Sequence, residues 1–127
     1  NKPVVIHSRK AEEDCLRILQ KKDVKKAMFH CYSGNVTLAK EIVENDYMIS
    51  LSTNILRSKN PRKTARRIPL DYLMTETDSP FLAPQGQEIN TPLNARLVIN
   101  RIAKEKNIQP GEVDKATTQN AKRFFKI

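Results

Sequence analysis

Short apolar runs recur along the chain at steps of roughly 20 to 25 residues, and an amphipathic or basic stretch follows each of them. The apolar runs occupy residues 4–6, 26–30, 47–51 and 72–76. The helix-like stretches occupy residues 11–20, 36–44, 60–67 and 92–106. A strand followed by a helix, repeated four times, predicts an α/β fold with a parallel sheet and right-handed crossovers.

The same pattern predicts which side chains form the core. Val4, Val5 and Ile6 are β-branched, which is typical of a strand buried on both faces. Two helices have predicted inward faces, made of Cys15, Leu16, Ile18 and Leu19 in the first and of Leu93, Leu97, Val98 and Ile102 in the long one. After the long helix we expect a short helical turn at Pro110 and a separate helix over residues 118–125. Phe124 and Phe125 are predicted to pair in the core.

Composition narrows the class of protein. A chain of 127 residues has room for one core, so we expect a single domain over residues 1–127. Hydrophobic residues make up 39% and charged residues 29% of the chain, and no apolar run is long enough to span a bilayer or to form a secretion signal. Cys15 and Cys31 are too few for a disulfide framework. These features favour a cytoplasmic protein with no membrane partner.

The charge is strongly positive, with 23 Lys and Arg against 14 Asp and Glu and a net charge of +9. Such a balance favours a polyanionic partner such as nucleic acid, although many basic proteins bind none. Six basic residues and no acid lie between positions 57 and 67. They are interpreted either as a solvated helix face or as phosphate contacts. The candidate phosphate-binding residues are Arg9, Ser33, Arg57 and Lys59.

Polar side chains stand where three of the four predicted strands end. His7 and His30 close the first two strands, and Asp78 follows the fourth. Because the carboxyl ends of parallel strands converge on one mouth of a barrel, residues far apart in sequence become neighbours there. Imidazole nitrogen and carboxylate oxygen suit a divalent metal ion. The sequence therefore predicts a metal site made by His7, His30 and Asp78, with a satisfied structural histidine as the alternative for each imidazole.

Two further residues flank this predicted site. Glu76 lies two positions before Asp78, so both side chains face the same side of an extended strand, and they form the candidate catalytic pair. Glu76 is expected one layer deeper, either orienting a metal ligand or capping the following turn. Cys31 directly follows His30, and since neighbouring strand residues face opposite sides, Cys31 is interpreted as a small buried hydrophobic residue. The third strand ends in Ser50-Leu51-Ser52-Thr53 and offers no strong ligand.

Three motifs together resemble one known family. They are Pro-Val-Val-Ile-His-Ser-Arg at residues 3–9, Phe-His-Cys-Tyr-Ser-Gly at 29–34 and Glu-Thr-Asp-Ser-Pro-Phe-Leu-Ala-Pro at 76–84. In this order and spacing they resemble the TatD family of deoxyribonucleases, and residues 116–125 are similar to that family's last helix. The resemblance runs from Pro3 to Phe125.

The resemblance implies a metal-dependent hydrolase on a TIM-like (β/α)8 barrel that cuts phosphodiester bonds in DNA with magnesium, manganese or zinc. By motif, His7, His30 and Asp78 match metal-binding residues, and Glu76 is the neighbour of that aspartate. A complete family site holds two ions and also uses a His-x-His motif on its first strand and a bridging glutamate, neither of which this sequence contains. Ile89 stands where the family has an arginine before Asn90.

This sequence thus resembles the carboxy-terminal half of such a barrel, beginning at the fifth strand. Four parallel strands leave two open edges and an inner face rich in Val, Ile and Met, so we expect self-association or a complementary amino-terminal half. Two other functions remain open. One is a barrel amidohydrolase acting on small esters or amides, and the other is a truncated, non-catalytic remnant that binds nucleic acid or itself.

Overall fold

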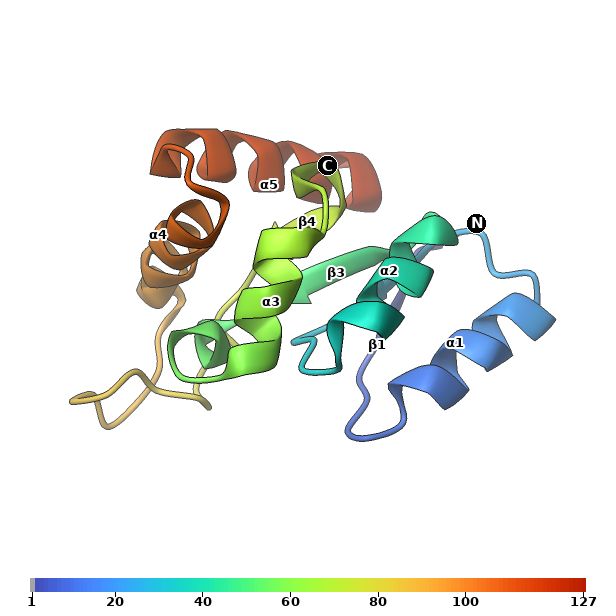
Figure 1. The fold of residues 1–127 in the computed structure, drawn as a ribbon, viewed down its shortest axis with the longest axis horizontal. Helices are drawn as coiled ribbons and strands as arrows, with labels where there is room; N and C mark the ends of the chain where they lie inside the picture. The colour runs from blue at the N-terminus through green and yellow to red at the C-terminus, as the bar shows by residue number, and fades with distance from the viewer. Residues whose placement is uncertain (1) are drawn as a thin grey trace.

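The structure is a computed structural model and describes residues 2–127. Its centre is a parallel sheet in the order β1-β2-β3-β4 (Figure 1). The strands are β1 (Val4–Ile6), β2 (Ala27–Phe29), β3 (Met48–Leu51) and β4 (Leu73–Thr75). Each strand pairs in parallel with the next one along the chain, as in half of a (β/α)8 barrel. The predicted α/β fold class is confirmed.

Helices follow the strands, and most of them cover one face of the sheet. They are α1 (Glu12–Lys21), α2 (Val36–Glu44), α3 (Lys59–Arg67), α4 (Ala95–Lys106) and α5 (Pro110–Phe125), with short 3-10 turns η1 (Thr53–Leu56), η2 (Leu70–Tyr72) and η3 (Pro92–Asn94). Figure 1 shows α1, α2 and α3 side by side in front of the sheet, α4 beside α3, and α5 across one end of the strands. No helix within residues 2–127 is both long and apolar enough to cross a membrane.

The covered face of the sheet forms the main core. Strand residues alternate between the two faces, and Phe29, Ile49 and Leu73 point toward the helices, each at most 1% exposed. They pack with helix residues that include Ile42 and Ile102. Burying an aliphatic or aromatic side chain of this size contributes about 1.5–3 kcal/mol. The helix layer therefore fixes the sheet and, with it, the direction of every side chain on the opposite, inner face.

The inner face carries a second, smaller cluster near the amino ends of the strands. Met28, Met48 and Met74 are 4–7% exposed and pack against Phe124 of α5. The last turns of α5 are tied to this end because Asn120 donates hydrogen bonds to the carbonyls of Leu70 (2.9 Å) and Leu73 (2.7 Å). The methionines that the sequence analysis expected to be exposed are thus covered by a helix of the same chain.

The prediction that β1 is buried on both faces is wrong. Val4 is 38% exposed and Val5 is 48% exposed. Among residues 2–127, β1 pairs with β2 alone, so it is an edge strand. Its β-branched residues fit a strand of a closed barrel, in which a further strand would cover them.

Several predicted core positions on the helices are also exposed. Leu16, Leu19, Val98 and Ile102 are buried as expected, but Ile18, Leu93, Leu97 and Phe125 are 37–79% exposed. These four residues lie on helix sides that no described element covers, because a single sheet face can bury only a narrow stripe of each helix.

The carboxy-terminal helix is continuous, which corrects the two separate pieces that the sequence analysis expected. Gln109 and Glu112 form a reciprocal capping box at the start of α5, and Pro110 occupies its first position. Val113, Thr117, Asn120 and Phe124 are its buried residues. They are spaced four, three and four residues apart, which is one helical face.

Candidate metal centre

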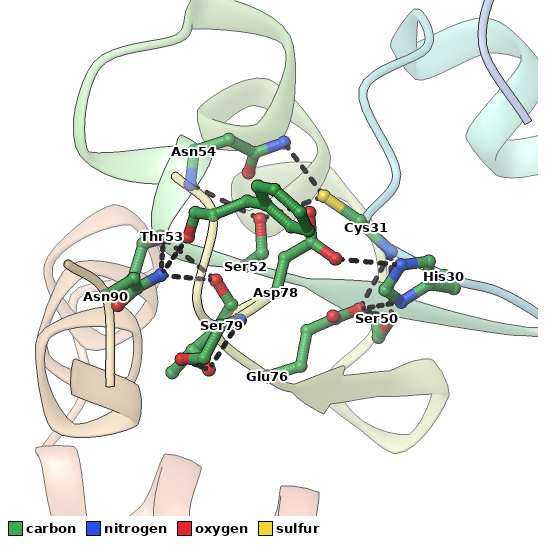
Figure 2. A network of polar contacts seen from close by, with 12 residues as sticks. His30, Cys31, Ser50, Ser52, Thr53, Asn54, Glu76, Asp78, Ser79 and Asn90 are labelled. Atoms are coloured by element: carbon green, nitrogen blue, oxygen red, sulfur yellow. Dashed lines mark hydrogen bonds and ion pairs between the residues drawn. The ribbon is translucent and has the colours of Figure 1, made fainter. Parts of the chain in front are cut away.

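Polar side chains occupy the inner face at the carboxyl ends of the strands. His30 lies two residues after Met28, and Glu76 two residues after Met74, so each shares the inner face with its methionine. Asp78 follows in the loop after β4. Figure 2 shows the side chains of His30, Glu76 and Asp78 pointing toward one another from β2 and β4.

The three side chains are close enough to share one ion. Nδ1 of His30 lies 2.8 Å from Oε1 of Glu76, and Nε2 of the same ring lies 3.2 Å from Oδ1 of Asp78. One ligand atom from each residue lies within 4.8 Å of the others. The side chains are 20–28% exposed, so an ion from solution can reach them. One imidazole and two carboxylates fit magnesium, manganese or zinc by their chemistry.

His7 stands beside this cluster without belonging to it. The His7 and His30 ring centroids are 5.7 Å apart, with the rings tilted by 35°. His7 is exposed and follows the edge strand β1. The structure thus brings His7, His30 and Asp78 to one end of the sheet, as expected, but the three-residue group that could hold an ion is made with Glu76 in place of His7.

Glu76 is held by more partners than the sequence analysis expected. Its Oε1 accepts a hydrogen bond from the Cys31 backbone N–H at 2.8 Å and a short one from Oγ of Ser50. The third strand, which offers no strong ligand, therefore contributes a hydroxyl to the site. Sequence spacing contained this signal, since Ser50 follows Met48 by two residues and shares its face.

Two residues at the site have left-handed backbone conformations. Cys31 has φ of 48° and Asp78 has φ of 61°, and neither is glycine. Such conformations cost about 1–2 kcal/mol for residues with a Cβ. They turn the chain sharply at the ends of β2 and β4, and local strain of this kind is frequent at functional sites.

The Cys31 thiol is partly buried and hydrogen-bonded, which corrects its interpretation as a simple buried hydrophobic residue. Its Sγ lies 3.0 Å from Oγ of Ser52, and Asn54 donates to it at 3.7 Å. Burial raises the pKa of the thiol from 9.0 to about 11, with nearby Glu76 and Asp78 acting in the same direction. At neutral pH the thiol stays protonated, which makes it a poor nucleophile.

Asn90 anchors the loop that carries Asp78, a role that the sequence analysis did not identify. Its Nδ2 is close to four acceptors, and the two shortest bonds reach the carbonyls of Phe81 (2.6 Å) and Thr77 (2.7 Å). The side chain is 2% exposed. Figure 2 shows Asn90 joined to Thr53, so the loops after β3 and β4 are tied together.

The candidate phosphate-binding residues lie in the segments that follow β1, β2 and β3. Arg9, Ser33, Arg57 and Lys59 are exposed. Within the described chain, no hydrogen bond joins their side chains to His30, Glu76 or Asp78. Arg57 lines a cavity of about 470 Å³ with Thr53 and residues 83–85.

Part of the basic stretch has structural roles. Arg62 donates hydrogen bonds to the carbonyls of Ile55 (2.9 Å) and Leu56. Arg66 pairs with Glu105 of α4 at 2.5 Å. These two guanidinium groups fasten α3 to its neighbours, so the basic stretch is neither a purely solvated face nor wholly available to a phosphate.

The chain is similar to known proteins over nearly its whole length. Residues 1–126 match the family described as TatD related DNase. The chain is 44% identical over 126 residues to an uncharacterized metal-dependent hydrolase of Methanocaldococcus jannaschii, covering 99% of this chain and 50% of that protein. It is 37% identical over 125 residues to human deoxyribonuclease TATDN3, covering 98% of this chain and 46% of that protein. The chain thus spans about half the length of these relatives.

The fold agrees as well. A TatD homolog from Escherichia coli superposes with a TM-score of 0.91 at 25% identity, covering 98% of this chain and 50% of the other. A TatD family hydrolase from Entamoeba histolytica superposes with a TM-score of 0.85 at 20% identity, covering 97% and 50%. The architecture is that of half a TatD barrel, as the motifs implied. The family match over nearly the whole sequence and the agreement in fold lead to one conclusion: this chain belongs to the TatD-related DNase family.

Proposed function

We propose that this chain provides the carboxy-terminal part of the active site of a divalent-metal hydrolase that cuts phosphodiester bonds in DNA. The observation that carries the proposal is the cluster of His30, Glu76 and Asp78 at the carboxyl end of a parallel sheet. In barrels of this kind that end holds the chemistry. The family match and the DNase named among the relatives support DNA as the substrate.

The chain's own residues divide the work. His30, through Nε2, and Asp78, through Oδ1, would hold the ion, and His7 stands near enough to be a further ligand in the complete site. When bound, the ion supplies positive charge that stabilises the charge developing on the phosphate oxygens. Asp78 also accepts a hydrogen bond from the attacking water and orients it, while Glu76 orients the His30 ring.

The basic surface would bind the phosphates that flank the scissile bond. Arg57 and Lys59 follow β3 and leave the same end of the sheet as the cluster, and Arg9 and Ser33 follow β1 and β2. The net charge of +9 supports a polyanionic substrate. If these side chains contact phosphates, the affinity for single-stranded DNA falls with salt, with a logarithmic slope of about −0.7 per contact.

The test is hydrolysis of single-stranded DNA by this chain with manganese or magnesium. We expect metal-dependent cleavage that Asp78→Asn lowers by roughly 100-fold or more. Asp114→Asn, an exposed carboxylate on α5, is the matched control and should leave the rate unchanged. Cleavage of small esters or amides without cleavage of DNA would contradict the proposal and favour an amidohydrolase.

A second candidate function is a non-catalytic, nucleic-acid-binding remnant. It is favoured by the small number of ligands, since the group that could hold an ion has three members in the described chain. Salt-sensitive binding of DNA with no cleavage in either metal would support it and exclude the first proposal for this chain.

We also propose that the chain associates with a second copy or with a complementary half barrel. The exposed edge strand β1 and the exposed Leu93 and Leu97 of the η3–α4 segment are surfaces that a closed barrel would cover. Light scattering at micromolar concentration tests self-association, and a monomer that stays compact and soluble would count against it.

A further inference from the structure

We infer that Ser50 is a positioning residue for the candidate metal centre. It fixes the Glu76 carboxylate, and Glu76 in turn determines which imidazole nitrogen of His30 faces Asp78. The effect on metal binding rests on the proposed function, whereas the orientation of His30 does not.

The contacts of Oε1 of Glu76 show how the carboxylate is held. Three groups converge on this one atom: the Cys31 N–H at 2.8 Å and the Ser50 hydroxyl donate hydrogen bonds to it, and Nδ1 of His30 lies 2.8 Å away. The Cys31 N–H also reaches Oγ of Ser50 at 3.1 Å, so the serine oxygen accepts from the backbone while it donates to the carboxylate. Figure 2 shows this convergence between β2, β3 and β4.

Burial makes the direction of the Ser50 hydrogen bond unambiguous. Ser50 is 2% exposed, so its single proton has no water to bind, and the carboxylate is the acceptor beside it. A buried hydroxyl without a partner costs about 1–3 kcal/mol, which favours this one arrangement. The carboxylate therefore cannot rotate away from His30 without breaking two further hydrogen bonds.

The fixed carboxylate selects the tautomer of His30. Carboxylate oxygens face both ring nitrogens, Oε1 of Glu76 at 2.8 Å from Nδ1 and Oδ1 of Asp78 at 3.2 Å from Nε2. The nearer and more firmly held Glu76 favours the ring proton on Nδ1, which leaves Nε2 on the side of Asp78 for an ion. Only an unprotonated ring nitrogen can bind a metal ion. Carboxylates behind ligand histidines serve this purpose in many metal sites, and their loss typically lowers metal affinity by about 10–100-fold. Here Ser50 holds the Glu76 carboxylate, which in turn lies against the His30 ring.

The experiment is ¹⁵N NMR of the imidazole nitrogens in this chain without metal, with the rings neutral. The sequence has two histidines, so His7→Gln assigns the His30 signals. We expect His30 to be protonated mainly at Nδ1 in the parent chain, and we expect the share of this tautomer to fall in Ser50→Ala. Ser52→Ala is the matched control, because Ser52 is buried on the same segment but bonds Cys31 and Asn54, and it should leave the tautomer unchanged.

A pair of variants keeps the test decisive if Ser50→Ala does not fold. Ser50→Thr and Ser50→Val have nearly the same shape and differ in the hydroxyl, so Thr should preserve the share of the Nδ1 tautomer and Val should lower it. A parent His30 protonated at Nε2, or equal tautomer populations in the Thr and Val variants, would overturn the inference.

Metal binding gives the second measurement. In a manganese titration we expect Ser50→Val to bind roughly 10-fold more weakly than Ser50→Thr. Equal affinities would overturn the positioning role in metal binding. If His30 has the expected tautomer but neither the parent chain nor any variant binds manganese, the proposed function is wrong. The orientation of His30 by Ser50 and Glu76 is then still supported.

Discussion

The two ends of the inner sheet face differ sharply, although the same strands build both. Methionines pack against Phe124 at the amino end, and polar side chains converge at the carboxyl end. On each strand the two kinds are two residues apart, as Met28 and His30, Met48 and Ser50, and Met74 and Glu76. A step of two residues along each strand thus separates a region that contributes to stability from a region whose side chains could bind a metal ion. A variant at one end should affect mainly the property that belongs to that end.

The largest expected effect is at the amino end. Phe124→Ala removes a ring that is 4% exposed and opens a cavity over the methionines, so we expect it to lower the free energy of unfolding by about 3–5 kcal/mol. Chemical denaturation measures this change. Phe125→Ala is the control because its ring is 40% exposed, and it should cost clearly less. Equal losses would show that the methionine cluster contributes little to stability.

The next effect is at the carboxyl end. Asn90→Ala leaves the carbonyl of Phe81 without its side-chain donor, whereas the carbonyl of Thr77 keeps the Thr53 hydroxyl at 3.0 Å. The loss should cost about 1–3 kcal/mol. Because this loop carries Asp78, the affinity for manganese should fall as well. Phe124→Ala should leave the manganese affinity of the folded protein unchanged. Asn100→Ala, on an exposed position of α4, is the control. Unchanged metal affinity in Asn90→Ala would separate the loop anchor from the site.

A third region, on the outer helix layer, sharpens the comparison through its pH dependence. Burial alone would raise the pKa of Glu105, but its hydrogen bonds to Arg66 and Arg101 outweigh burial and lower the pKa below the ordinary 4.5. The ion pairs therefore stabilise the fold above pH 4.5, and this contribution is lost as pH falls through the lowered pKa.

We expect Glu105→Gln to lower stability at neutral pH by on the order of 1 kcal/mol and the difference from the parent to shrink in acid. Thermal unfolding followed at several pH values checks this, with the exposed loop residue Glu88→Gln as the control. A difference that is constant with pH would show that the charge of Glu105, and hence its ion pairs with Arg66 and Arg101, does not stabilise the fold.

The smallest expected effect is on the edge strand. Val5 lies beside Met28 in the strand register and yet is 48% exposed, whereas Met28 is 7% exposed. Val5→Thr should change the free energy of unfolding by less than about 0.5 kcal/mol, and Met28→Thr should change it by considerably more. A large loss in Val5→Thr, measured by denaturation, would mean that another strand covers β1 in solution.

The fold could be predicted from the sequence because its signals are local: the spacing of apolar residues and the residues that begin and end each helix. The strand at residues 4–6 and the helix at 36–44 have the predicted bounds, and Asn35 caps that helix through its side chain. What failed depended on neighbours far along the chain. Val5 and Leu97 are apolar at the spacing expected of buried positions. That spacing does not show whether another element is present to bury them.

In the candidate site, too, some features could be predicted from the sequence and others depended on tertiary packing. The grouping of His30 with Asp78 followed from the rule that parallel strands end at one mouth. The hydrogen bonds of Ser50 and Asn90 did not, because a serine or an asparagine gains its role from the carboxylate or carbonyl that tertiary packing sets against it. That residues 1–127 form one domain stays a prediction.

The free edge of β1 has a thermodynamic consequence for His7. Within residues 2–127 this strand has one hydrogen-bonded neighbour, and His7 follows directly from it. A strand added at that edge would restrict the His7 ring beside His30. If His7 ligates the ion, strand addition and metal binding are reciprocally coupled: each strengthens the other by the same factor, so metal affinity would rise with the concentration of whatever completes the sheet.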